Sequence, residues 1–271
     1  LNNKTPRCHT VPGKEKDRLG NAGFSPEESR RYSRHVLLEE IGWTGQQKFK
    51  AAKVLVVGAG GLGSASLFYL AAAGVGEIGL VDGDAVEVSN LQRQILHGVE
   101  DLERRKVDSA RDSLRKLNPH CRVQTFDLWL NGTQVSEILR GYDVVLDASD
   151  NFPTRFQVAD CCWQEKIPLV SAAVAEFSGQ LLVVDPRRES PCYRCLLPEP
   201  PPAEGPSEQP FGILGAVAGV MGSLQAVETL TLLLGRNSAL DHQLLSYDAL
   251  RSRFHLLPRE KNPACPLCGE N

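Results

Sequence analysis

The chain has 271 residues, of which 42% are hydrophobic and 23% are charged, and its formal net charge is −3. A chain of this size and composition can bury the core of one large α/β domain. The charge balance argues against a basic protein that binds nucleic acid or a membrane surface, so we expect protein and small-molecule partners.

The first 23 residues are polar, with Pro, Lys and Gly, and contain no apolar signal-peptide core. We expect residues 1–23 to be a flexible extension and residues 24–271 to form the folded domain. Without a secretory signal, the protein is expected to be cytoplasmic.

The first predicted helix begins at Ser25-Pro26-Glu27-Glu28. Ser25 can cap it, Pro26 suits the first helical position, and Glu28 can complete a capping box. We expect this helix to run to about Glu39 and a second one to cover residues 46–52, with Gly42-Trp43-Thr44-Gly45 as the break. The first helix carries a basic cluster, ordinarily a solvated face: Arg30, Arg31 and Arg34.

A strand, a glycine loop and a helix follow between Lys53 and Asp82. The apolar run 54–57 predicts a buried parallel strand, and residues 62–73 suit a helix that starts directly from Gly58-Ala59-Gly60-Gly61-Leu62-Gly63. Glycines let the backbone approach a phosphate, and the free N–H groups of the helix start attract anions. Asp82 ends the next strand, where a carboxylate can accept hydrogen bonds from a ribose. The loop alone does not distinguish NAD, FAD and ATP, or exclude a turn kept for packing.

Residues 83–94 are polar, aperiodic and of normal complexity, which is typical of a functional loop at the carboxyl edge of the sheet. Arg93 in this loop has a phosphate within plausible reach. A helix is predicted over residues 104–117, with Lys106 near its start. A lysine there opposes the helix dipole, so an ordinary exposed salt bridge explains it less well.

Further strands are predicted over residues 121–126 and 142–146, and the second of these is followed by Asp147, Asp150 and Asn151. Asp150 could hold a divalent cation through its oxygens. Alternatively, Asp147 or Asp150 simply caps the helix predicted over residues 152–166. The residue types alone do not choose between the two interpretations.

The remaining predicted strands cover residues 168–174 and 179–185, joined as a hairpin, and residues 243–247 and 253–257. Residues 198–212 contain many prolines and predict a mobile crossover. The apolar run 215–234 is nearly long enough to span a membrane, but Gln225, Glu228 and its glycines favour a buried packing helix.

Two C-x-x-C pairs suggest a metal site: Cys192 with Cys195, and Cys265 with Cys268. Four thiolates suit a closed, structural zinc site, although redox pairs are the alternative. We assign the cysteines no catalysis. Cys121, Cys161 and Cys162 have apolar surroundings and are expected to be inert.

Together these stretches resemble the ThiF/MoeB adenylyltransferases, relatives of the ubiquitin-activating enzymes, over about residues 25–269. The likeness rests on Arg31-Tyr32-Ser33-Arg34, the glycine loop, Ser89-Asn90-Leu91-Gln92-Arg93-Gln94, Lys106, residues 147–151, residues 222–226 and both cysteine pairs. It implies a Rossmann-like, doubly wound, mainly parallel sheet with an antiparallel extension and a four-cysteine zinc knuckle. It also implies a homodimer that uses Mg·ATP to adenylate the C-terminal Gly-Gly carboxylate of a small ubiquitin-like sulfur carrier, releasing pyrophosphate.

The resemblance assigns roles to individual residues. Arg93 and Lys106 match phosphate-contacting positions, Asp150 the catalytic magnesium ligand, and Arg34 an arginine donated by the partner subunit. The residues that we expect to bind the nucleotide are Gly58, Gly60, Gly61, Gly63, Asp82, Asp84, Ser89, Asn90, Gln92, Arg93, Lys106, Asp150 and Asn151.

One departure from the family concerns the crossover, because many relatives carry a cysteine there and residues 198–215 contain none. We therefore expect the enzyme to stop at the acyl-adenylate, as the molybdopterin-synthase-activating branch does. The alternatives are another acceptor such as a ribosomal peptide, an NAD-dependent Rossmann oxidoreductase, and an inactive half of a heterodimeric activating enzyme.

Overall fold

The computed structural model describes residues 23–132, 134–201 and 212–269. The chain divides into two compact units, residues 1–47 and residues 48–271. The flexible extension predicted for residues 1–23 and the mobile crossover predicted for residues 198–212 lie mostly outside the described residues. The extent of the domain, residues 24–271, stays a prediction.

In the first unit, helix α2 (Pro26–Arg31) begins with the capping box predicted from the sequence. The Glu28 backbone N–H donates to Ser25 Oγ at 3.1 Å, and the Ser25 N–H donates to Glu28 Oε2 at 2.8 Å. The helix ends at Arg31, so the predicted extension to Glu39 is wrong. Turns follow up to residue 41, and α3 (Gly42–Ala51) starts at Gly42, four residues before the predicted start of the second helix.

Tertiary contacts explain the early end of α2. Tyr32, which caps the helix, is buried and meets Phe24 edge to face, with 6.2 Å between ring centroids. The His35 ring stacks on Tyr32, and its Nδ1 lies 3.1 Å from Gln46 Oε1. These contacts favour the turns over the helix that local propensity predicts.

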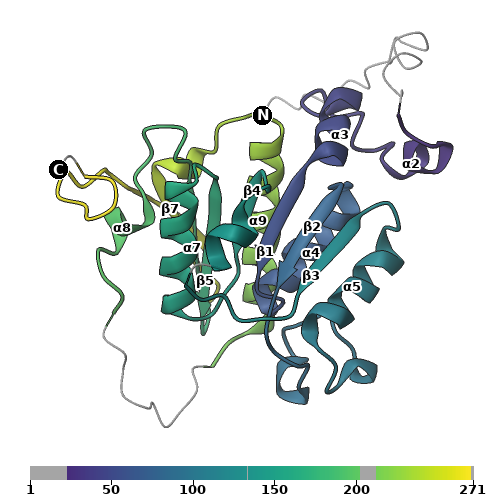
Figure 1. Cartoon of the computed structure of the whole chain (residues 1–271), viewed down its shortest axis with the longest axis horizontal. Helices are drawn as coiled ribbons and strands as arrows, with labels where there is room; N and C mark the ends of the chain where they lie inside the picture. Colours follow the sequence, from purple (N-terminus) through teal and green to yellow (C-terminus); the bar gives the residue numbers. More distant parts are fainter. Residues whose placement is uncertain (1–22, 133, 202–211, 270–271) are drawn as a thin grey trace, which may run out of the picture. The chain divides into compact units, whose positions relative to one another are not determined.

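The second unit is built on an eight-stranded mixed sheet with the order β3-β2-β1-β4-β5-β6-β7-β8 (Figure 1). The first five strands in this order pair in parallel, and the last three extend the sheet in antiparallel fashion. The strands are β1 (Lys53–Val57), β2 (Glu77–Val81), β3 (Arg122–Phe126), β4 (Val144–Asp147), β5 (Leu169–Ala175), β6 (Ser178–Val184), β7 (Gln243–Asp248) and β8 (Arg253–Pro258). This is the predicted α/β class.

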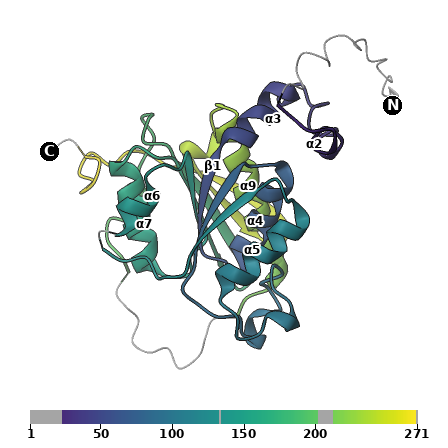
Figure 2. The ribbon, with the colours of Figure 1, turned by 45° about the vertical axis from the view of Figure 1, so that its right-hand side comes forward.

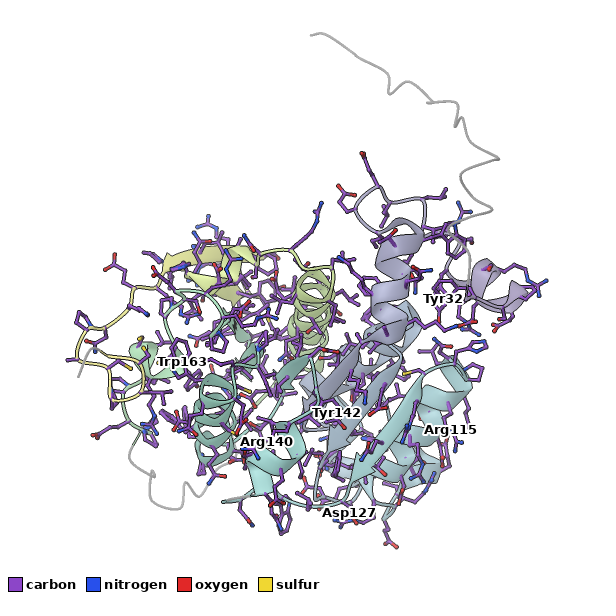
Figure 3. The ribbon with its side chains drawn as sticks, turned by 45° about the horizontal axis from the view of Figure 1, so that its top comes forward. Tyr32, Arg115, Asp127, Arg140, Tyr142 and Trp163 are labelled. Atoms are coloured by element: carbon purple, nitrogen blue, oxygen red, sulfur yellow. The ribbon has the colours of Figure 1, made fainter. Side chains whose placement is uncertain are left out.

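Helices cover both faces of the sheet (Figure 2). One face carries α4 (Gly61–Ala73), α5 (Lys106–Leu117) and α9 (Gly215–Leu233), whose apolar side chains share a core with alternate residues of the strands. The other face carries α6 (Gln134–Leu139) and α7 (Phe152–Gln164) over a second core. Arg140, labelled in Figure 3, follows α6 and pairs with Glu165 after α7 at 2.8 Å. The short helix α8 (Tyr193–Leu196) contains Cys195, and Cys192 is its N-cap residue.

Helix α9 is the one described helix that is long and apolar enough to cross a membrane by length and hydropathy. It packs instead against α4: a Cβ added at Gly222 would lie 2.3 Å from Leu62 O. Gln225 is fully buried, and its Nε2 donates to the carbonyls of Asp147 at 2.9 Å and Val170 at 3.2 Å. The helix therefore belongs to the core, as expected, and links β4 to β5.

Candidate functional site

A cavity of about 630 Å³ opens at the carboxyl ends of the parallel strands. Its wall includes Val57 at the end of β1, Val81 at the end of β2 and Ala148 just after β4. The chain order reverses between β1 and β4, because β2 and β3 extend the sheet to one side and β4 to the other. Ligands of open α/β sheets bind at such a reversal.

The glycine loop forms the floor of this cavity. Gly58 has φ +104°, and a Cβ added there would lie 2.7 Å from Ala148 O. A Cβ at Gly63 would lie 2.0 Å from Gly58 O. Gly60 caps α4 and offers no side chain to the first-turn N–H groups. The loop therefore leaves open backbone donors at a helix start, which suits an anionic group.

Asp82 fixes the shape of the loop from the end of β2. Its Oδ2 accepts the N–H of Ala59 at 2.8 Å, and its Oδ1 accepts the N–H of Asp84 at 2.9 Å. Burial raises the pKa of Asp82, although the nearby Lys106 ammonium opposes the rise. The carboxylate lines the cavity and is available to further donors.

Lys106, the first residue of α5, has a side chain that is only 6% exposed. Its Nζ lies 2.7 Å from Asp84 Oδ2, while Trp129 Nε1 donates to Asp84 Oδ1 at 3.1 Å. Partial burial would raise the pKa of Asp84, but the hydrogen bond and charge of Lys106 outweigh it and lower the pKa. The counter-ion Asp84 explains a lysine at a helix start, and both residues line the cavity.

Arg93 is held within its own loop. Its Nη1 donates to Ser89 O at 3.2 Å and its Nη2 to Asn90 Oδ1 at 3.0 Å. Arg93 lines the cavity, whereas Gly63, Ser89, Asn90 and Gln92 are outside its lining. The start of α9 packs directly on this loop, since a Cβ at Gly215 would lie 2.4 Å from Gln92 O.

The acids after β4 have different environments. Asp147 is buried and accepts hydrogen bonds from Ser149 N–H at 3.1 Å, Ser149 Oγ at 2.5 Å and Ser171 Oγ at 2.8 Å. Asp150 is exposed on the cavity wall, and within the described residues its carboxylate has no hydrogen bond or ion pair. Neither acid caps α7: Asn151 does, by accepting the Thr154 N–H at 2.9 Å. The capping interpretation of the acids is therefore wrong.

Arg34 belongs to the first unit, in the exposed turn after α2. The structure describes it within that unit alone, and its predicted role across a dimer stays a prediction.

Three residues in or next to the cavity were not predicted: Gln94 and Arg155 line it, and His97 contacts the glycine loop. Gln94 is 3% exposed, and its Oε1 is a buried acceptor without a partner among the described residues. His97 bridges Ala59 O at 3.1 Å and Ser109 Oγ at 2.8 Å, and burial lowers its pKa. Arg155 lines the cavity and donates to Ser149 O at 2.6 Å. Gln94 belongs to a stretch that carries the family resemblance, residues 89–94, so the sequence did contain a signal for it. No sequence signal marks His97.

The four predicted cysteines come together, with all Sγ atoms within 4.8 Å of one another. Sγ–Sγ distances are 3.8 Å for Cys192 to Cys195, 3.4 Å for Cys192 to Cys265 and 3.3 Å for Cys195 to Cys268. Zn–S bonds of about 2.3 Å in a tetrahedron require sulfur atoms about 3.8 Å apart, so the cluster fits a zinc ion with little adjustment. Burial opposes ionisation of Cys265, but N–H groups of Cys268 and Leu267 lower its pKa to about 7.

The other three described cysteines lie apart from this cluster. Burial raises the pKa of Cys121 to about 12 and raises the pKa values of Cys161 and Cys162 as well. Thiols that stay protonated are poor nucleophiles, which agrees with inert core residues.

These features are typical of an α/β enzyme that binds a nucleotide where the strand order of its sheet reverses. They are the glycine loop, the reversal itself, and the acids and cations on the cavity wall. The sequence pattern of the ThiF family matches residues 32–267, and the chain belongs to this family. It is an ATP-using adenylyltransferase, so the oxidoreductase alternative is set aside.

Named relatives agree with this assignment. The chain is 47% identical to the SAMP-activating enzyme E1 of Haloferax volcanii, covering 89% of this chain and 88% of that protein. It is 46% identical to the sulfur carrier protein adenylyltransferase of Thermus thermophilus, covering 91% and 93%. The adenylyltransferase and sulfurtransferase MOCS3 of Bos taurus is 48% identical over 92% of this chain but only 55% of its own length.

Solved structures support the fold. The crystal structure of E. coli MccB with MccA-N7isoASN superposes with a TM-score of 0.80, at 23% identity, over 92% of this chain and 76% of that chain. The E. coli MccB structure with ATP gives 0.76, at 23% identity, over 89% and 75%.

Proposed function

We propose that this enzyme adenylates the C-terminal Gly-Gly carboxylate of a small ubiquitin-like sulfur carrier, giving an acyl-adenylate and pyrophosphate. The observation that carries the proposal is the common cavity of Arg93, Lys106 and Asp150 beside the glycine loop. The relatives named as a sulfur carrier protein adenylyltransferase and a SAMP-activating enzyme support this choice of acceptor.

The proposed roles follow from charge. When a carboxylate attacks the α-phosphate of ATP, negative charge grows on the phosphate oxygens, and cations fixed beside them stabilise the transition state more than the ground state. Arg93 and Lys106 supply these cations. N–H groups of Gly58 to Gly63 hold the phosphates, and Asp82 accepts hydrogen bonds from the ribose.

Asp150 is the proposed ligand of a magnesium ion, because its carboxylate is exposed to the cavity and without a partner among the described residues. Hard oxygen donors suit Mg²⁺, and Asn151 beside it offers an amide. Bound magnesium would supply Lewis-acid stabilisation of the phosphates. The residues of this chain orient the triphosphate on the glycine loop and hold Lys106 ready through Asp84.

The proposed enzyme is a cytoplasmic homodimer that stops at the acyl-adenylate. Residues 198–215 contain no cysteine, and Cys161 and Cys162 are buried with raised pKa values. Another nucleophile would then complete sulfur transfer, for example in molybdenum cofactor or thiamine synthesis. A persulfide or thioester on Cys161 or Cys162, found by mass spectrometry of trapped reactions, would overturn this part.

The main test is ATP–pyrophosphate exchange with carriers that end in Gly-Gly, comparing the native chain with Asp150→Ala. We expect carrier-dependent exchange that is lost in the variant and absent with a carrier lacking Gly-Gly. Exchange with a free peptide but with no carrier would favour a peptide acceptor instead. No exchange with any carrier would contradict the proposal.

Donation of Arg34 across a dimer is tested by mixing two inactive variants, Arg34→Ala and Asp150→Ala. If the arginine crosses the interface, a mixed dimer has one site with both residues, and activity returns in part. If Arg34 acts within its own subunit, both sites of the mixed dimer lack a residue and the mixture stays inactive.

A further inference from the structure

Arg259, directly after β8, is a buried arginine that joins separate parts of the second unit. It is 6% exposed, and among the residues that the structure describes its guanidinium donates only to backbone carbonyls. Nη1 donates to Val183 O at 3.1 Å and Leu240 O at 3.4 Å, and Nη2 donates to Pro191 O at 2.7 Å. The buried Nε has no hydrogen-bond partner among the described residues. Its hydrogen-bonding capacity is therefore incompletely used.

Arg259 also lacks a carboxylate partner in the described part of the chain. Within the described residues no Asp or Glu forms an ion pair with it, although other arginines of this region each have one: Arg187–Asp185 at 2.8 Å, Arg188–Asp241 at 3.4 Å and Arg194–Asp160 at 2.7 Å. A buried cation with no counter-ion strongly destabilises a fold. A sequence that keeps an arginine here implies a compensating negative charge from another source.

The cysteine cluster is that source. Cysteines bind zinc as thiolates, and four thiolates carry more negative charge than one divalent ion neutralises. The carbonyl of Pro191, which accepts from Nη2, belongs to the residue just before the ligand Cys192. Arg194, which also lies beside the cluster, differs from Arg259 in making two-pronged contacts with a carboxylate, that of Asp160. The buried guanidinium is therefore bonded to the residue next to a cluster ligand.

We propose that Arg259 is the counter-ion of the zinc–thiolate cluster and a positioning residue for the first cysteine pair. Each group stabilises the other in the interior: the guanidinium offsets the charge of the loaded cluster, and the cluster offsets the burial of the guanidinium. The inference rests on the proposed zinc site and is independent of the proposed acceptor.

The electrostatic environment agrees with the geometry. Burial lowers the pKa of Arg259, while Cys195, Cys192 and Asp241 oppose that effect. Asp241 is shared with Arg188, so it cannot serve Arg259 alone. The position of Arg259 also has a structural effect, because it connects β6, through Val183, to the start of the segment that ends in Cys265 and Cys268. Zinc binding and the packing of the segment that ends in Cys268 should therefore both depend on the positive charge of Arg259.

The test is the zinc affinity of the full-length chain, measured by competition with a chromogenic chelator, for native protein, Arg259→Gln and Arg259→Lys. Gln removes the charge, whereas Lys keeps the charge and loses the planar fork. Groups that support metal ligands typically change affinity by about 10–100-fold. We expect about a tenfold loss in Arg259→Gln and a much smaller loss in Arg259→Lys. Arg251→Gln is the control, because Arg251 is exposed and pairs with Asp248 at 2.8 Å.

Cobalt substitution supplies a second measurement, because thiolate-to-cobalt absorption reports whether four sulfurs still bind. We expect the native spectrum at saturating cobalt in Arg259→Lys, with half-saturation near the native value. Native zinc affinity in Arg259→Gln would overturn the inference. Equal losses of zinc affinity in both variants would assign the effect to hydrogen bonding and would also overturn the inference. If Arg259→Gln does not fold, Arg259→Lys alone decides. A tenfold loss of zinc affinity in Arg259→Lys, which keeps the charge, would reject the charge role. A native chain that binds no zinc would overturn the zinc site and this inference together.

Discussion

Gly58 packs directly on the backbone of Ala148, and this contact joins the end of β1 to the residue that follows β4. A Cβ on Gly58 would lie 2.7 Å from Ala148 O, at a φ of +104°. The floor of the nucleotide cavity therefore depends on the missing side chain at this position.

We expect Gly58→Ala to destabilise the protein by about 1–3 kcal/mol through backbone strain alone, with the clash adding to it, and to abolish ATP binding. The matched control is Gly141→Ala, because Gly141 has a similar φ of +95° and nothing within 4 Å of the added Cβ. It should lose about 1–2 kcal/mol and still bind ATP. Denaturant unfolding and nucleotide titration measure the two effects. Normal ATP binding by Gly58→Ala would contradict the close approach.

Replacing Lys106 tests whether its positive charge contributes to the reaction rate. Lys106→Met should lower the rate of pyrophosphate exchange by about a hundredfold or more, because the cation proposed to lie beside the phosphates is lost. Lys116→Met, near the other end of α5 and exposed, is the control and should keep the native rate. A native exchange rate in Lys106→Met would remove Lys106 from the catalytic machinery.

Asp147 and Asp150 should respond in opposite ways to the same change. Asp147→Asn weakens a buried acceptor of three hydrogen bonds and should cost about 2–3 kcal/mol of unfolding free energy. Asp150→Asn alters an exposed carboxylate, so thermal stability should be unchanged while exchange activity is lost. Calorimetry and the exchange assay on both variants check this contrast. A stable Asp147→Asn protein would show that the buried acid is dispensable.

His97 should make stability depend on pH. Burial lowers its pKa below the ordinary 6.5 in the folded protein, so the folded imidazole stays neutral where the unfolded one is protonated. Between the folded pKa and about 6.5 the unfolded chain binds more protons, and stability falls as the pH is lowered through this window. His97→Gln should flatten this part of the curve, whereas His255→Gln, on the exposed strand β8, should not. Equal slopes in native protein and His97→Gln, measured by unfolding between about pH 5 and 7, would contradict it.

Removing one cysteine of the cluster should remove the metal. The native chain is expected to hold about one zinc ion, and Cys265→Ser should lose it with a marked fall in melting temperature. Cys121→Ala changes a buried thiol outside the cluster and should retain zinc. Elemental analysis with thermal unfolding measures both quantities, and native zinc content in Cys265→Ser would contradict the four-ligand site.

Local patterns predicted much of the fold because the sheet is built from segments that carry their own signals. The apolar run before Gly58 becomes β1, and the alanine-rich stretch after the loop becomes α4. The two C-x-x-C pairs were predicted to meet because a four-thiolate metal site needs its ligands close in space and not along the chain, and their Sγ atoms do lie together. The predicted hairpin is the antiparallel pair of β5 and β6, and the predicted closing strands are β7 and β8.

The errors arose where packing and side-chain hydrogen bonds, which local patterns do not contain, decide the structure. The stop of α2 depends on Tyr32 packing against Phe24, which no helix pattern contains. Asn151 competes successfully with both neighbouring acids for the cap of α7, and only the fold shows that Asp147 is turned into serine hydroxyls. His97 and Arg259 lack motifs because their partners are backbone carbonyls from other strands and loops, together with one serine hydroxyl.

The close packing of α9 has a consequence for the thermodynamics of nucleotide binding. At Gly215 and Gly222 the helix backbone meets the Arg93 loop and α4 without intervening side chains. Such a wall has few alternative arrangements, so its ordering occurs during folding and not when the ligand arrives. Under the proposed phosphate-binding roles, the entropic cost of binding should fall mainly on the long side chains of Arg93 and Lys106, whose partners in this structure are Asn90 and Asp84.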